Sequence, residues 1–216
     1  MLKQLLLLIM PTFFIYIGLS VFEDILITFI LFYGWLLFIP LLFTFWKKAN
    51  RPSLQLPLTK TNLWVGIISG LICLVSIYGF VAIFQSSVLD IPQLQRLLEK
   101  WDFSGAKVIL LVLVLALINP ILEELYWREF MFGGLSTKLG NVIAVLITAI
   151  FYSMYHFIVV NEIFSFPFNV LSVISVFLAG LMWGIFRIKL NSIVASIISH
   201  SLADIGIMLV YWLIIR

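Results

Sequence analysis

Two adjacent glutamates and an arginine stand near the end of an apolar stretch of this chain. Positions 123–128 read Glu-Glu-Leu-Tyr-Trp-Arg. An ionised side chain costs about 2.5–3.5 kcal/mol at the centre of a membrane helix, so such groups mark functional sites or ion pairs. Arg128 follows Glu124 by four residues, and this spacing permits an ion pair that simply orders the helix. Glu123 points about 100° away and has no arginine of its own, so it is the better candidate for chemistry.

Both histidines of the chain, and one further acid, also lie in apolar segments. Tyr152 and His156 are one helical turn apart in one segment, and His200 and Asp204 are one turn apart in another. Residues four apart share a helix face, so His200 and Asp204 can converge on one point or on one metal ion. The alternatives are structural. His156 can be a hydrogen-bonded packing residue, and Asp204 can simply orient a core histidine.

The combination of these groups is more informative than any one pair. Two carboxylates, two histidines and a third acid on three apolar segments can activate a water molecule for attack on a peptide bond. The sequence contains no Gly-x-Ser-x-Gly and no His-Glu-x-x-His element, so a serine elbow or that zinc-binding helix is not supported. Intramembrane acids and histidines also form proton relays, which leaves a proton- or ion-coupled transporter open. Transporters are often built from repeated halves, and no internal repeat is visible here.

The overall composition predicts helices that hold these residues inside a membrane. Of the 216 residues, 63% are hydrophobic and 11% are charged, and the mean hydropathy is +1.20. Soluble domains carry about 25% charged residues, and a helix needs about 20 mainly apolar residues to cross a bilayer. We therefore predict an all-α polytopic transmembrane helical bundle of about seven spans, with eight as the alternative. The predicted spans are residues 4–22, 25–46, 63–85, 107–131, 141–160, 168–187 and 191–213.

The fourth predicted span contains a proline just before the two glutamates. Pro120 removes a backbone donor and clashes with the preceding turn, so we expect the helix to kink or to restart there. If the helix restarts, Asn119 is its N-cap and Pro120 its first helical residue. Glu123 and Glu124 would then lie close to the positive end of a helix dipole.

Basic residues predict the orientation of the chain. With a cytoplasmic N-terminus, nine of the thirteen lysines and arginines fall on the cytoplasmic side, as the positive-inside rule requires: Lys3, Lys47, Lys48, Arg51, Lys60, Arg128, Lys138, Arg187 and Lys189. Residues 47–62 form a basic loop broken by prolines. Residues 91–101 have apolar residues at helical spacing, which predicts a helix in the interface plane or an ordinary connecting helix. The net charge of +3 is too small and too scattered to indicate nucleic acid.

Three short motifs in the second half of the chain resemble a family of intramembrane proteases. This is the CAAX-protease and bacteriocin-processing family, also called CPBP or ABI, which includes the Rce1-type prenyl endopeptidases. Its pattern is Glu-Glu-x-x-x-Arg, then Phe-x-x-x-His, then His-x-x-x-Asn or Asp. The order, spacing and placement of the motifs agree over roughly residues 105–213. The matching residues are Glu123, Glu124 and Arg128, then Tyr152 (in place of phenylalanine) and His156, then His200 and Asp204.

The resemblance implies roles for these residues. Glu123 would act with His156 to activate the attacking water, while His200 and Asp204 would stabilise the oxyanion. An ionised aspartate donates no hydrogen bond, so Asp204 would have to be protonated or to orient His200 instead. Family members are often labelled metalloproteases, and Glu123, His156, His200 and Asp204 could form a zinc site. No cofactor is required by the sequence, and we favour a glutamate-activated water without obligatory zinc.

The expected function is therefore hydrolysis of a peptide bond in a membrane-associated peptide or protein. A transporter or a bacteriocin immunity protein that binds without cutting is the alternative. We expect an integral protein of a bacterial plasma membrane with a cytoplasmic N-terminus, whose partners are the substrate and the lipid bilayer. Residues 1–104 would form N-terminal helices, the basic cytoplasmic loop and an interfacial segment, and residues 105–216 the catalytic core of one integrated bundle. The catalytic candidates are Glu123, Glu124, Arg128, His156, His200 and Asp204.

Overall fold

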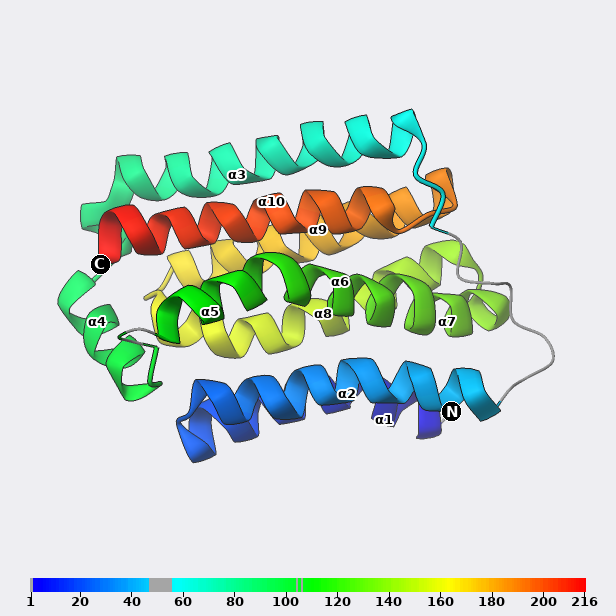
Figure 1. The fold of residues 1–216 in the computed structure, drawn as a ribbon, viewed down its shortest axis with the longest axis horizontal. Helices are drawn as coiled ribbons and strands as arrows, with labels where there is room; N and C mark the ends of the chain where they lie inside the picture. The colour runs from blue at the N-terminus through cyan, green and yellow to red at the C-terminus, as the bar shows by residue number, and fades with distance from the viewer. Residues whose placement is uncertain (1, 47–55, 104, 106) are drawn as a thin grey trace.

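The computed structural model describes residues 2–46, 56–103, 105 and 107–216 of the chain. Within these ranges the chain is helical and contains no strand (Figure 1). Seven helices in the described ranges are long and apolar enough to cross a membrane, which confirms the prediction of an all-α bundle with seven spans. These spans are Leu2–Phe22, Ile25–Phe43, Lys60–Val88, Val108–Leu139, Asn141–Ile163, Phe168–Leu190 and Val194–Ile215.

The long helices run side by side, and a short helix lies across one end of the bundle (Figure 1). Several spans are composite, with α-helical and π-helical (η) stretches in one continuous run. The elements are α1 (Leu2–Tyr16), η1 (Ile17–Phe22), α2 (Ile25–Trp46), α3 (Lys60–Val88), α4 (Ile91–Lys100), α5 (Lys107–Leu113), η2 (Val114–Ile118), α6 (Asn119–Glu124), η3 (Leu125–Met131), α7 (Phe132–Leu139), α8 (Asn141–Ile163), α9 (Phe168–Leu190), α10 (Val194–Val210) and η4 (Tyr211–Ile215).

The first two helices are attached to the fourth span by buried hydrogen bonds. The Tyr126 hydroxyl in η3 donates to the Leu7 carbonyl in α1 at 2.5 Å, and the Trp35 indole in α2 donates to the Tyr126 oxygen at 2.9 Å. In the low-dielectric interior such bonds are costly to leave unmade. They hold α1 and α2 against the span that carries the two glutamates.

Glycines bring α3 and α10 into close contact. A Cβ added at Gly206 would lie 3.0 Å from the Leu74 backbone, and one at Gly70 would lie 2.9 Å from the Ser199 Cα. Small residues at such positions let membrane helices approach closely, because lipid provides no hydrophobic drive to push them together. This contact sets the position of α10, which carries His200 and Asp204.

The fourth span does not restart with Asn119 as its cap, so that alternative is wrong. Asn119 has helical dihedrals (φ −52°, ψ −55°), and its side chain caps no helix. Pro120 follows the π-helical stretch η2, whose wider turn accommodates the missing donor and the ring that would clash with the Ala116 carbonyl in an α-helix. Glu123 and Glu124 therefore lie inside a continuous helix and not at the positive end of a helix dipole.

The segment after α3 is a connecting helix, α4, whose apolar face is covered by protein. Asp90 caps it by accepting from the Gln93 backbone N–H at 3.0 Å. Leu94 is buried against Val81 and Val210. This packing places α4 across the ends of α3 and α10. Most of the predicted basic loop, residues 47–55, lies outside the described residues.

Candidate active site

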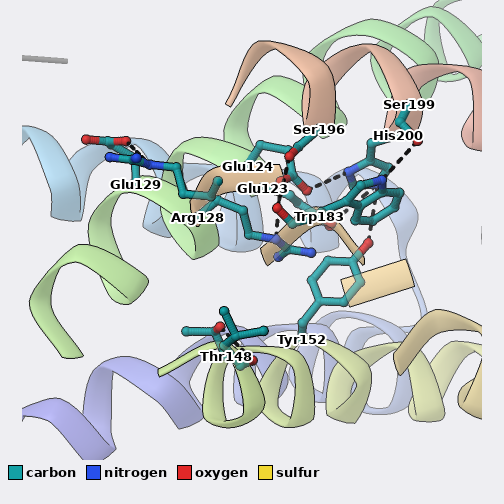
Figure 2. Close-up of polar contacts among 12 residues, drawn as sticks. Glu123, Glu124, Arg128, Glu129, Thr148, Tyr152, Trp183, Ser196, Ser199 and His200 are labelled. Atoms are coloured by element: carbon teal, nitrogen blue, oxygen red, sulfur yellow. Dashed lines mark hydrogen bonds and ion pairs between the residues drawn. The ribbon is translucent and has the colours of Figure 1, made fainter. Parts of the chain in front are cut away.

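His200 lies at the centre of a buried polar cluster (Figure 2). Its side chain is 2% exposed, and its Nδ1 lies 3.1 Å from Glu124 Oε1. An ionised carboxylate only accepts hydrogen bonds, so Nδ1 carries a proton. The Trp183 indole from α9 stacks on the imidazole, with ring centroids 4.3 Å apart and planes 18° apart. These two contacts fix both the tautomer and the orientation of the His200 ring.

Three oxygen atoms from three helices surround the other nitrogen of His200. Tyr152 Oη lies 3.3 Å from Nε2, Asp204 Oδ2 lies 3.6 Å away, and Glu123 Oε2 lies 3.7 Å away. The two carboxylate distances exceed hydrogen-bond length, and separations of this size are commonly bridged by a water or a ligand oxygen. His200 and Asp204 therefore converge on one point, as their spacing predicted.

Glu124 bridges His200 and Arg128. Its Oε2 lies 3.2 Å from Arg128 Nε, an ion pair with both side chains almost fully buried. This confirms the pair predicted from the four-residue spacing. The guanidinium carbon also lies 4.6 Å from the Tyr152 ring centroid and 5.4 Å from that of Trp183. Such cation–π contacts stabilise a desolvated arginine.

Glu123 has a different environment from its neighbour. It is 2% exposed, and within the described chain its charged partner at ion-pair distance is His200 and not an arginine. Among the described residues its Oε2 has no hydrogen-bond partner. Within the same residues, Oε2 of Glu124 also lacks a hydrogen bond, but it forms the ion pair with Arg128 Nε. The two glutamates therefore differ in their charged partners, as the sequence spacing predicted.

His156 lies beside this cluster and contacts it through Tyr152. Its Nδ1 lies 2.9 Å from the Tyr152 carbonyl, which can only accept, so Nδ1 is protonated and Nε2 is the acceptor of the neutral ring. Its ring packs on Tyr152 and Tyr155, with centroids 4.6 and 4.4 Å away. In the described part of the chain, no hydrogen bond or ion pair joins His156 to Glu123 or His200. Tyr152 contacts both histidines.

One comparison with known proteins identifies this part of the chain. Residues 105–206 match the model of a family described as type II CAAX prenyl endopeptidase Rce1-like. This segment is similar to the Rce1-like family. No curated protein and no solved structure matches the chain. The Rce1-like segment contains every catalytic candidate: Glu123, Glu124, Arg128, His156, His200 and Asp204.

The Rce1-like match and the apolar helices define the general class of the protein. The family supports a CAAX-type intramembrane protease. Seven helices of membrane-spanning length and composition in the described ranges support an integral membrane protein. The resemblance found from the three motifs is therefore confirmed at the level of the family.

The Rce1-like segment also contains polar residues that the sequence did not identify as site residues. The Asn119 amide donates to Asp204 Oδ2 at 3.0 Å. The Trp183 indole N–H donates to Ser199 Oγ at 3.1 Å, and the Ser196 hydroxyl donates to the Trp183 carbonyl at 3.2 Å (Figure 2). In the sequence these residues can be recognised as polar side chains within apolar helices, but that pattern does not indicate which residue each one contacts.

The Rce1-like site does not fit the zinc centre that the sequence allowed. Zinc takes about four ligands at roughly 2.0–2.3 Å from one point. Among the described residues, no three His, Cys, Asp or Glu side chains are grouped to hold a metal ion. The Nδ1 atoms of His156 and His200 are engaged with a carbonyl and a carboxylate, and Nε2 of His200 faces the Tyr152 hydroxyl.

Proposed function

We propose that this chain is an intramembrane endopeptidase in which Glu123 activates a water molecule for attack on a peptide bond. The observation that supports this is the position of Glu123 Oε2, buried without a hydrogen bond among the described residues and 3.7 Å from Nε2 of His200. A general base needs a free lone pair beside the group that receives the developing charge. Glu124 and Arg128, which neutralise each other, suit a supporting role.

The proposed reaction uses the groups around His200. Glu123 takes a proton from water while the water oxygen bonds to the scissile carbonyl carbon and the carbonyl π electrons move to its oxygen. His200, held at Nδ1 by Glu124, faces this oxyanion with Nε2 and donates to it from the imidazolium form. The carbon–nitrogen bond then breaks as Glu123 returns the proton to the leaving amine.

His156 and Asp204 complete this assignment. His156 donates from Nδ1 to the Tyr152 carbonyl, and its Nε2 can therefore accept a hydrogen bond from the attacking water. Asp204 accepts from Asn119 and lies one turn from His200, so we assign it to orienting the imidazole. A base and an orienting carboxylate together are a common arrangement in hydrolytic sites.

The site lies within spans of the bundle, so we propose a substrate that reaches it from the membrane. We assign the catalytic core to residues 105–216 and the supporting helices to residues 1–104. The substrate would be a membrane-associated peptide or protein cut near its C-terminus. We place the protein in a bacterial plasma membrane, and its lysine and arginine distribution supports a cytoplasmic N-terminus.

Cleavage by the purified protein tests this function. The full chain in detergent or nanodiscs is incubated with prenylated and unprenylated C-terminal peptides, and the cut site is found by mass spectrometry. Glu123→Gln should lower the cleavage rate at least about 100-fold, as loss of a general base does. Glu129→Gln is the matched control, because Glu129 pairs with Arg187 at 3.0 Å at a more exposed position. Cleavage at the parent rate by E123Q would contradict the assignment.

A further inference from the structure

Three oxygens face Nε2 of His200, and they differ in their ability to donate a hydrogen bond. Glu123 Oε2 and Asp204 Oδ2 belong to carboxyl groups, which only accept when ionised. Tyr152 Oη carries a proton and can donate. Because Glu124 holds the proton on Nδ1 of His200, a neutral His200 has no proton on Nε2. In that state Nε2 of His200 and the two ionised carboxylates can only accept, and the Tyr152 hydroxyl is the donor among these four groups.

We propose that Tyr152 donates its hydroxyl hydrogen to the oxyanion formed during peptide hydrolysis, as a second catalytic donor beside His200. This inference rests on the proposed function. Its hydroxyl oxygen lies 3.3 Å from Nε2, so one oxygen atom can lie within hydrogen-bond distance of both groups. The hydroxyl rotates freely about its C–O bond, so it can donate to Nε2 at rest and to the oxyanion during the reaction. It donates without transferring its proton, so the proton balance stays with Glu123.

The Tyr152 ring is held firmly enough for this role. It is 2% exposed, and its face lies 4.6 Å from the Arg128 guanidinium carbon. Trp127 and Trp183 contact it edge-to-face, with centroids 6.3 and 5.9 Å away. Donors that are preorganised in this way stabilise a developing charge without reorganising at the moment of reaction. Figure 2 shows the hydroxyl directed at His200, on the side of the ring away from Thr148.

Asp204 offers an independent way to restore the donor. Its Oδ2 lies 3.6 Å from Nε2 of His200 and accepts from the Asn119 amide. Asp204→Asn keeps the shape of the side chain. With its NH₂ group at the position of Oδ2 it adds a donor next to Nε2, and the Asn119 amide can turn over so that its oxygen accepts from the same NH₂ group. If the missing feature in a Tyr152 variant is a donor, this change should supply it.

The test compares four variants of the full chain in the cleavage assay. Tyr152→Phe should lower kcat by about 100-fold and change KM by less than about threefold, as loss of one oxyanion donor does. Tyr152→Phe combined with Asp204→Asn should recover at least about tenfold of kcat. Asp204→Asn alone is the reference for the double variant. Tyr126→Phe is the control for loss of a buried hydroxyl, because that hydroxyl bonds to α1 outside the cluster.

Two of the possible outcomes overturn this inference alone. A kcat of Y152F within threefold of the parent overturns the role of Tyr152, while inactivity of E123Q still supports the protease. A large loss that D204N does not recover assigns Tyr152 to structure and also overturns the inference. Absence of cleavage by the parent chain overturns both. Thermal unfolding in detergent checks folding, and if Y152F does not fold, the double variant compared with D204N alone gives the same test.

Discussion

Removal of the Arg128 charge should destabilise the protein strongly. Arg128 is 1% exposed and its Nε lies 3.2 Å from Glu124 Oε2. At an effective dielectric constant near 20, an ion pair at this distance is worth about 5 kcal/mol. Arg128→Met removes this attraction and leaves a buried carboxylate, a change that typically costs about 3–5 kcal/mol. For a chain of this size, the expected fall in Tm is roughly 10 °C.

A double variant isolates the charge effect. Glu124→Gln combined with Arg128→Met removes both charges, so no buried carboxylate is left unpaired at this position. The double variant should therefore be more stable than R128M, although it carries one more substitution. Thermal unfolding in detergent, followed by tryptophan fluorescence, measures both. A parent-like Tm for R128M, or a double variant less stable than R128M, would refute the reasoning.

Two further substitutions test how the site is positioned. Trp183→Phe keeps a ring on His200 but removes a buried hydrogen bond worth about 0.5–1.5 kcal/mol. The cleavage assay should therefore show kcat lowered by roughly two- to tenfold. An unchanged kcat would mean that the indole N–H does not position the site. Gly206→Ala places a Cβ 3.0 Å from the Leu74 backbone, and overpacking of this kind should cost about 1–3 kcal/mol in thermal unfolding. Gly79→Ala, where nothing lies within 4 Å, is the control, and equal stability of the two variants would exclude the close contact.

The local features of this protein follow from sequence spacing. Hydropathy alone predicts seven spans, because a helix in a bilayer must satisfy its own backbone and cover it with apolar side chains. The Glu124–Arg128 and His200–Asp204 pairs are also local, since a four-residue separation places side chains on one helix face. A three-motif pattern then identifies the family, which the match over residues 105–206 confirms.

The fourth span shows where local rules fail. A proline after Asn119 predicts either a kink or a new helix capped by Asn119, and the chain does not restart but continues from a π-helical stretch. The competing effect is tertiary. The Asn119 side chain is directed at another helix, where it donates to Asp204.

The sequence determines which polar residues are present and where each lies along its helix. Which helix faces meet depends on close packing across the bundle. Glu123 and Glu124 can be recognised as exceptional from their cost in hydrocarbon alone. Only the tertiary structure decides that Glu124 holds Nδ1 of His200 while Glu123 and Tyr152 face Nε2. Among the described residues, it also leaves His156 bonded to the Tyr152 carbonyl and without a hydrogen bond or ion pair to Glu123 or His200. The physical reason is that spacing determines a direction around one helix axis, whereas distances between helices depend on the small residues and glycines through which they pack.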